Sequence, residues 1–284
     1  MMGTLYLVAT PIGNLEDITL RALRILGEVP LIAAEDTRTT RKLLTHHGVR
    51  APRLLSYTER NRRSRTPAIL AALQQGDVAL VSEAGMPGIS DPGVHLVEAA
   101  VAAGYQVAPV PGPSALTAAL VASGLPTRRF HYLGFLPRQA SHRRRLLRQV
   151  AALPETLVAF EAPHRLRAAL ADLRETLGDR RVAVCRELTK LYEEIFRGTL
   201  SQALDHFAEP RGECTLVIEG AGEAKPRLEA PEGIDDELRA LRAQGQHARD
   251  AMRAVVRHTG RSRQEVYRRW LALSQEDGPE STVS

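Results

Sequence analysis

The feature that most constrains this chain is a loop at residues 81–93 that holds three glycines and two prolines, far more than a plain connection needs. A strand-like apolar run at 78–81 leads into it, and a helix-like run begins near Val94. Such a loop keeps its backbone bare and rigid, so that a ligand can approach main-chain N–H and C=O groups closely. It follows the end of a strand, where open α/β sheets hold their ligands. For a single loop of this kind, an ordinary strand-to-helix turn would be the simpler interpretation.

Two further strand ends carry the same signature. The loop Thr10–Asn14 follows the apolar run 5–9, and the loop 110–116 follows the run 106–108, with Ser114 placed as a candidate helix N-cap. None of the three loops matches G-x-G-x-x-G or G-x-x-x-x-G-K-[ST], and none supplies a lysine for a phosphate chain. Together they predict one crevice whose ligand is held by backbone contacts and shape.

The chain is expected to divide into two α/β domains, at 1–124 and 125–220, followed by a linker at 221–233, a small helical domain at 234–274 and a disordered tail at 275–284. In the first domain, strands and helices alternate as in a largely parallel sheet covered on both faces. The expected strands are 4–9, 31–34, 53–56, 78–82, 106–109, 130–134, 156–160, 181–186, 193–198 and 213–219. The expected helices of the two α/β domains are 17–27, 38–47, 64–75, 92–103, 114–122, 141–152, 164–177 and 200–208.

The helical domain is expected to contain two short helices joined by a glycine turn, like a helix-turn-helix unit. Gly260 should end the first helix and Ser262 should cap the second. Tyr267 and Trp270 are expected in the core rather than as stacking residues. Arginines cover the polar side, so both RNA docking and a helical hairpin with solubilising arginines stay open.

The net charge of +5 is unevenly distributed. Seven arginines and no acid lie between Arg128 and Arg148, and four more arginines lie between Arg60 and Arg65. A solvated surface usually interleaves acids, whereas acid-free basic stretches attract phosphates. These clusters therefore predict contact with nucleic acid, for which Arg143 and Arg144 are the main candidates.

Composition argues against several other classes of protein. Aromatic residues make up 4% of the chain, so no base-stacking platform of the RRM or single-strand-binding kind is evident. No run approaches the ~20 apolar residues of a membrane span, and no signal peptide is expected, which predicts a cytoplasmic protein. Cys185 and Cys214 form no C-x-x-C pair and are expected to be buried thiols. The nine histidines show no ligand spacing, so no metal site is expected.

Several strings resemble, in the same order, the ribosomal RNA small subunit methyltransferase I family of the tetrapyrrole-methylase superfamily. They are Thr10–Asp17, Ala34–Arg38, Ala84–Gly93, Pro111–Ser114, Gly134–Pro137, Phe160–Leu166 and Arg186–Lys190. The resemblance implies two α/β domains with a cofactor crevice between them. It also implies a homodimeric, S-adenosylmethionine-dependent enzyme that methylates the ribose 2′-hydroxyl of a decoding-centre cytidine in 16S rRNA. As a separate hypothesis, we expect the substrate to be the rRNA within the 30S subunit, because an RNA site folded only there would suit a protein that reads shape and phosphates.

The glycine loop departs from the family pattern at two positions. Glu83 stands where the family usually has Asp, and Met86 stands where it usually has Thr. Glu83 keeps the charge on a longer arm, whereas Met86 lacks the hydroxyl of threonine. Backbone contacts at Gly85 and Pro87 depend on neither side chain.

The loops and the resemblance together indicate which residues contact the cofactor and the RNA. The expected cofactor-binding residues are Pro11, Gly13, Gly85, Pro87, Ile89, Ser90, Pro111, Gly112 and Ser114. The expected contacts to RNA phosphate or ribose are Arg38, His164, Arg165, Arg186, Lys190, Arg143 and Arg144. For the residues after the strands of the second domain, an ion-pair network that holds the turns together is the alternative.

Three carboxylates are candidates for the base that accepts the hydroxyl proton. Glu35 and Asp36 follow the apolar strand 31–34, and Asp91 lies near the end of the glycine loop. Neighbouring carboxylates point to alternate sides, so one can face the crevice while the other caps the next helix or pairs with Arg38. Simple helix capping by this pair is the alternative interpretation.

Two other functions stay open at this point. The same fold could methylate a small tetrapyrrole, although the arginine clusters would have no obvious use there. A non-enzymatic helix-turn-helix protein that binds nucleic acid would leave the three proline- and glycine-rich loops without a purpose.

Overall fold

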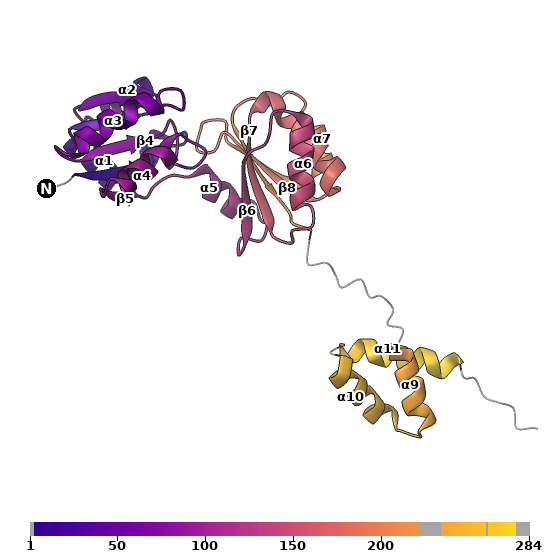
Figure 1. Cartoon of the computed structure of the whole chain (residues 1–284). Coiled ribbons are helices and arrows are strands. Elements are labelled where there is room, and N and C mark those ends of the chain that lie inside the picture. Colours follow the sequence, from indigo (N-terminus) through magenta and orange to yellow (C-terminus); the bar gives the residue numbers. More distant parts are fainter. Residues whose placement is uncertain (1–2, 222–233, 260, 277–284) are drawn as a thin grey trace, which may run out of the picture. The chain divides into compact units, whose positions relative to one another are not determined.

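The computed structural model describes residues 3–221, 234–259 and 261–276 (Figure 1). The chain forms two compact units, divided between Gly222 and Glu223. The expected linker, apart from its first residue, and the expected tail from residue 277 on lie outside the described residues, as does Gly260. No helix within the described ranges is long and apolar enough to span a membrane.

The larger unit begins with a five-stranded sheet in the order β3-β2-β4-β1-β5, all of whose neighbours are parallel. Its strands are β1 Thr4–Val8, β2 Leu31–Ala34, β3 Arg53–Ser56, β4 Val78–Val81 and β5 Gln106–Val110. Every residue of β2 and β4 is buried, which explains why both are continuous apolar runs. Since the strands are parallel, the three proline- and glycine-rich loops all follow their carboxyl ends at the same edge.

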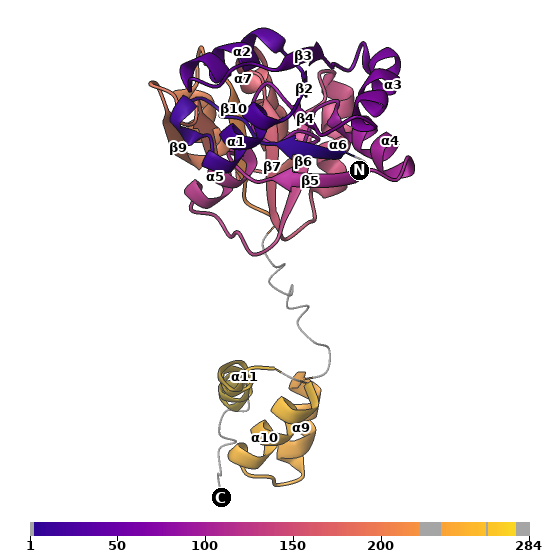
Figure 2. The ribbon, with the colours of Figure 1, turned by 90° about the vertical axis from the view of Figure 1, so that its left-hand side faces the viewer.

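Helices cover both faces of this sheet. Leu26 of α1 and Leu44 of α2 are buried on one face, and Ile69 of α3 and Leu96 of α4 are buried on the other. Figure 2 shows these two pairs of helices on opposite sides of the sheet. The helices are α1 Leu20–Glu28, α2 Thr37–His46, α3 Arg62–Leu73 and α4 Gly93–Ala102.

A second five-stranded sheet has the order β6-β7-β10-β8-β9, with only β6 and β7 parallel. Helices α6, α7 and α8 bury one face, and α5 packs on the other beside Ile12 and Leu188. Figure 1 shows α6 and α7 on one side of this sheet and α5 on the other. Cys185 and Cys214 are buried free thiols, as expected. The remaining elements of this unit are α5 Ala115–Ala122, β6 Phe130–Phe135, α6 Ala140–Val150, β7 Thr156–Glu161, α7 Pro163–Leu177, β8 Arg181–Arg186, β9 Glu194–Thr199, α8 Leu200–His206 and β10 Cys214–Ile218.

The observed elements confirm the expected two-sheet α/β fold with one local correction. The single helix expected at 17–27 is a short 3-10 turn, η1 Leu15–Asp17, followed by α1. Two successive caps cause the break. The Asn14 side chain accepts the Glu16 N–H at 3.1 Å, and the Thr19 hydroxyl accepts the Ala22 N–H at 3.1 Å, which starts α1 afresh.

Within its described residues, the smaller unit has three helices rather than the two expected: α9 Ile234–Ala243, α10 Ala248–Thr259 and α11 Arg263–Glu276. The additional helix, α9, contributes Ile234 and Leu238 to the hydrophobic core of this unit, where both are buried. Ser262 caps α11 as expected, because its hydroxyl accepts the Glu265 N–H at 3.3 Å. The expectation for Tyr267 is wrong, since it is 49% exposed, whereas Trp270 packs against the core.

Candidate functional site

The loops after β1 and β4 are joined backbone to backbone. Thr10 and Gly85 each donate an N–H to the other's carbonyl, both at 2.9 Å. Gly85 has φ +79°, a conformation that favours glycine. The loop after β5 packs equally closely, because a Cβ on Gly112 would lie 2.9 Å from the Cβ of Ala9. The three loops therefore form one continuous backbone surface at the edge of the sheet.

The predicted cofactor-binding residues all lie in these joined loops, and they differ in accessibility. The buried ones are Pro11, Gly85 and Pro87; Ser114 is half-buried; the exposed ones are Gly13, Ile89, Ser90, Pro111 and Gly112. Ser114 is the N-cap residue of α5, as expected, although its side chain makes no capping hydrogen bond. The exposed members can offer backbone groups to a ligand.

Two contacts bring the second sheet to this edge. Ser90 Oγ lies 2.7 Å from the Tyr132 hydroxyl of β6. The Asn14 N–H donates to Thr189 Oγ1 at 3.0 Å, in the connection between β8 and β9. A Cβ on Gly13 would lie 2.5 Å from Lys190 Cγ and 2.8 Å from the Leu188 carbonyl, so the close approach of the two chain segments requires glycine here.

Three carboxylates gather at the same edge. A carboxylate oxygen of Glu35 accepts the Glu83 N–H at 3.1 Å, which links the end of β2 to the loop after β4. Burial, reinforced by the negative charges of Glu35 and Glu83, raises the pKa of Asp91 to about 7, although a hydrogen bond from Ser82 opposes the shift. A carboxylate with a pKa near neutrality is suited to accept and release a proton.

Asp36, by contrast, is the N-cap of α2. Its carboxylate accepts the backbone N–H of Arg38 at 2.7 Å and that of Thr39 at 3.4 Å. It also accepts a side-chain hydrogen bond from Arg38 at 3.1 Å, and this partner holds the pKa of Asp36 below its usual value. Asp36 thus has the capping role that the sequence left open, and among the three predicted bases the environment singles out Asp91.

The prediction that Arg143 contacts RNA needs correction. Arg143 is buried in α6 and forms an ion pair with Asp172 of α7, whose other oxygen accepts from Arg144 at 2.7 Å. Arg144 also pairs with Glu175 at 3.2 Å. The arginine run contains no acid in the sequence, but in the fold α7 packs against α6 and places Asp172 and Glu175 beside these arginines.

The other predicted RNA contacts of the second sheet are largely in ion pairs. Arg165 pairs with buried Glu161, and Arg186 donates to Glu194 at 2.8 Å. Lys190 donates to Glu187 at 2.9 Å and lies 3.4 Å from Glu213. His164 is exposed at the start of α7. These contacts match the alternative of an ion-pair network that holds the turns, with His164 outside it.

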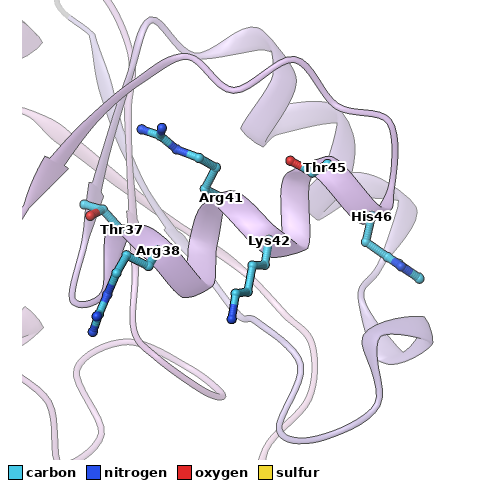
Figure 3. Close-up of a pocket in the computed structure, with 6 residues that line it drawn as sticks. All are labelled: Thr37, Arg38, Arg41, Lys42, Thr45 and His46. Carbon is cyan, nitrogen blue, oxygen red and sulfur yellow. The ribbon is translucent and has the colours of Figure 1, made fainter.

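A hollow of about 800 Å³ lies along α2 (Figure 3). It is lined by Thr37, Arg38, Arg41, Lys42, Thr45 and His46. Of these, only Arg38 was expected from the sequence to contact RNA. The missed signal is the spacing, because residues 38, 42 and 46 recur every fourth position and so share a helix face. Among the described residues, the ion pair of Arg38 with Asp36 is the only one on this surface.

Residues 4–204 match the sequence model of the family described as Tetrapyrrole (Corrin/Porphyrin) Methylases. A relative from Synechocystis named "Ribosomal RNA small subunit methyltransferase I" is 49% identical, and the match covers 96% of this chain and 99% of the relative. A relative of the same name from Thermotoga maritima is 52% identical over 77% of this chain and 99% of its own. The chain belongs to the ribosomal RNA small subunit methyltransferase I family of tetrapyrrole methylases.

Two solved methyltransferase structures share the fold. A uroporphyrin-III C-methyl transferase from Thermus thermophilus, complexed with S-adenosyl homocysteine, aligns with a TM-score of 0.53 at 24% identity, covering 78% of this chain and 98% of that one. The methyltransferase CobJ aligns with a TM-score of 0.58 at 21% identity, covering 77% of this chain and 95% of its own. Both alignments support the two-sheet architecture of the family.

Proposed function

We propose that this protein transfers a methyl group from S-adenosylmethionine to the ribose 2′-hydroxyl of a decoding-centre cytidine in 16S rRNA, in the cytoplasm and as a homodimer. The observation that carries the proposal is the 49% identity along 96% of the chain to a relative named "Ribosomal RNA small subunit methyltransferase I". The site is consistent with it, since a carboxylate with a pKa near 7 lies beside loops of bare backbone.

S-Adenosylmethionine fits the chemistry of these loops. They offer backbone groups near Ser90 and Gly112, and they contain no lysine, which agrees with a ligand that carries no phosphate. When bound, the cofactor supplies a sulfonium methyl group, so that a C–O bond forms to the ribose oxygen while the S–CH3 bond breaks and S-adenosylhomocysteine is left. Uncharged backbone amides and carbonyls suit a zwitterionic, partly apolar molecule of this kind.

Asp91 is proposed as the group that accepts the proton of the ribose hydroxyl. A 2′-hydroxyl is a weak nucleophile, and a positioned base contributes about 10²–10⁴-fold to the rate of such a step. The proton leaves the hydroxyl as the new C–O bond forms, passes to the Asp91 carboxylate and then to solvent. Correct placement of the reacting atoms by the loops would supply a further ~7–11 kcal/mol.

Two basic surfaces are proposed to hold the RNA through its phosphates. One is the α2 surface around Arg41 and Lys42. The other lies in the smaller unit, where a hollow of about 320 Å³ is lined by Arg249, Met252, Arg253, Val256 and Arg263. Such contacts position an RNA without reading its sequence. An RNA site that is folded only in the 30S subunit would suit a protein that recognises shape and phosphates.

Charge reversal on the α2 surface tests whether this helix binds the RNA phosphates. The double substitution Arg41→Glu and Lys42→Glu is expected to weaken binding to 30S subunits and to lower the slope of log K against log salt by ~0.7–0.9 for each phosphate that is no longer neutralised. The matched control is Arg21→Glu with Arg24→Glu, which reverses two exposed charges on α1 outside the hollow. Equal weakening by both pairs would mean that net charge, not the α2 surface, attracts the RNA.

The proposed function is tested by transfer of labelled methyl from S-adenosylmethionine to three substrates: unmodified 30S subunits, free 16S rRNA and a tetrapyrrole. Label on 30S subunits in preference to free rRNA is expected. Equal labelling of both would contradict recognition of the assembled subunit, and label on the tetrapyrrole alone would replace the rRNA substrate. Deletion of residues 234–284 should spare cofactor binding but weaken binding to the subunit.

A further inference from the structure

The side chain of Phe135 is 53% exposed at the carboxyl end of β6. It owes this position to an irregularity in the strand. The register between β6 and β7 shifts between Tyr132 and Phe135, and Gly134 has φ +68°. A bulge of this kind adds a residue to one strand and redirects the side chain that follows it.

The bulge places Phe135 in a row of three aromatic rings. Phe160 of β7 contacts Tyr132 edge to face at a centroid distance of 5.3 Å and contacts Phe135 in the same manner at 5.5 Å. Tyr132 packs against the cluster that also contains Ile12 and α5, so this row lies on the face of the second sheet that meets the first. Phe135 is the exposed end of the row, because Tyr132 and Phe160 are both half-buried.

This row of rings borders the loop that carries the proposed base. The hydroxyl of Tyr132 lies 2.7 Å from Ser90 Oγ, and a Cβ on Gly134 would lie 3.7 Å from the same atom. Ser90, with φ +65°, directly precedes Asp91. The strand segment that carries Phe135 therefore lies beside the loop of Ser90 and Asp91.

The turn that carries Phe135 is firmly held. Arg165 donates to the Leu136 carbonyl at 3.2 Å, and Arg143 donates to the carbonyls of Pro137 at 3.1 Å and Arg138 at 3.3 Å. Each arginine is in turn paired with a buried acid of the second sheet or of its helical layer. Three successive carbonyls fixed in this way hold the backbone that directly follows Phe135.

We propose that Phe135 is a base-stacking residue that receives the unstacked nucleobase of the target nucleotide, and so places its ribose beside Asp91. This proposal rests on the proposed function. A methyltransferase that must reach a sugar hydroxyl in structured RNA benefits from drawing the nucleotide out of its stack, and aromatic rings are the usual partners of splayed-out bases. The low aromatic content of the chain argued against a base-stacking platform with several rings. It does not argue against this role, because one ring in the right place is sufficient to stack on one base.

The test compares Phe135→Ala, Phe135→Leu and Phe135→Trp with Phe130→Ala, a matched control at the opposite end of the same strand that is 38% exposed. Removal of the ring is expected to lower kcat/KM for 30S subunits by about 5- to 150-fold, the range for one base–aromatic stack, with unchanged affinity for S-adenosylmethionine. Phe135→Leu should behave like Phe135→Ala, because it is apolar but cannot stack. Phe135→Trp should retain activity, and the introduced indole fluorescence should be quenched when 30S subunits bind.

Three outcomes would overturn the proposal while wild-type protein still methylates 30S subunits. They are full activity of Phe135→Ala, rescue by Phe135→Leu, and a change in the oligomeric mass of Phe135→Ala, which would assign the ring to a subunit interface. If wild-type protein fails to methylate any rRNA, the proposed function itself is wrong. The two failures are thus distinguished by the wild-type control.

Discussion

Asp91→Asn is expected to lower kcat for methyl transfer by about 10²–10⁴-fold while the affinity for S-adenosylmethionine is kept. The substitution preserves the shape of the side chain but removes its ability to take up a proton. Rapid-mix single-turnover transfer to 30S subunits measures the chemical step directly. The matched control is Glu83→Gln, which neutralises an exposed carboxylate of the same loop and is expected to leave most of the activity.

The pH dependence of kcat/KM provides a second, independent test of Asp91 as the base. Because the base must be deprotonated and the pKa of Asp91 is raised to about 7, kcat/KM should rise with pH up to about 7 and then level off. Residual activity in Asp91→Asn should lack this rise. If the variant keeps the wild-type profile, another group is the base.

Folding stability supplies the control for this variant. The raised pKa means that the folded protein retains a proton on Asp91 that the unfolded chain loses, so stability falls as pH rises from the ordinary value of 3.8 to about 7. Asp91→Asn removes this half-buried charge, and at pH 8 the variant should therefore melt no earlier than wild type. A lower melting temperature would indicate that the reduced activity reflects misfolding.

The second large effect is expected at Asp172, whose side chain is 5% exposed and pairs with Arg143 and Arg144. Asp172→Ala would leave the buried Arg143 guanidinium without its carboxylate, which is expected to cost about 3–5 kcal/mol in the free energy of unfolding. Urea denaturation of the full chain, followed by circular dichroism, measures this difference.

Two matched variants separate burial from mere removal of charge. Glu175→Ala removes an acid of the same helix that is 63% exposed and also pairs with Arg144, so it should cost less than about 1 kcal/mol. Joint replacement of the buried pair, Arg143→Met with Asp172→Leu, should restore much of the stability that Asp172→Ala removes. Equal costs for Asp172→Ala and Glu175→Ala would mean that burial of the Arg143–Asp172 pair does not set the effect.

The strands of both sheets could be predicted from the sequence to within about one residue, because apolar runs such as 31–34 and 78–81 are bounded by proline, glycine and polar residues. Helix α1 was less predictable. Two capping residues lie close together here: Asn14 caps the 3-10 turn η1, and Thr19 caps α1 five residues later, so the sequence alone did not fix where α1 begins. The core role of α9 depends on contacts with α10 and α11 that periodicity cannot reveal.

The carboxylates of the candidate site could be predicted from the sequence, but the sequence could not show which of them is suited to act as the base. The sequence pointed to Glu35, Asp36 and Asp91 together, since all three follow strands of one sheet. Only the folded structure separates them, because Asp36 caps α2 whereas burial raises the pKa of Asp91. The prediction that Arg143 contacts RNA was wrong for a related reason. Its ion-pair partner Asp172 is distant in the sequence, so the pair could not be seen before the fold was known.

The position of the transferred methyl group tests the proposed ribose methylation most directly. Unmodified 30S subunits would be labelled from S-adenosylmethionine, and the 16S rRNA would then be cleaved with alkali. Alkaline cleavage of a phosphodiester bond requires a free 2′-hydroxyl on the preceding nucleotide, so a 2′-O-methylated nucleotide resists it. We expect label in an alkali-resistant dinucleotide that yields 2′-O-methylcytidine on enzymatic digestion. Label in an ordinary mononucleotide would place the methyl group on a base, and this would contradict a site built to methylate ribose.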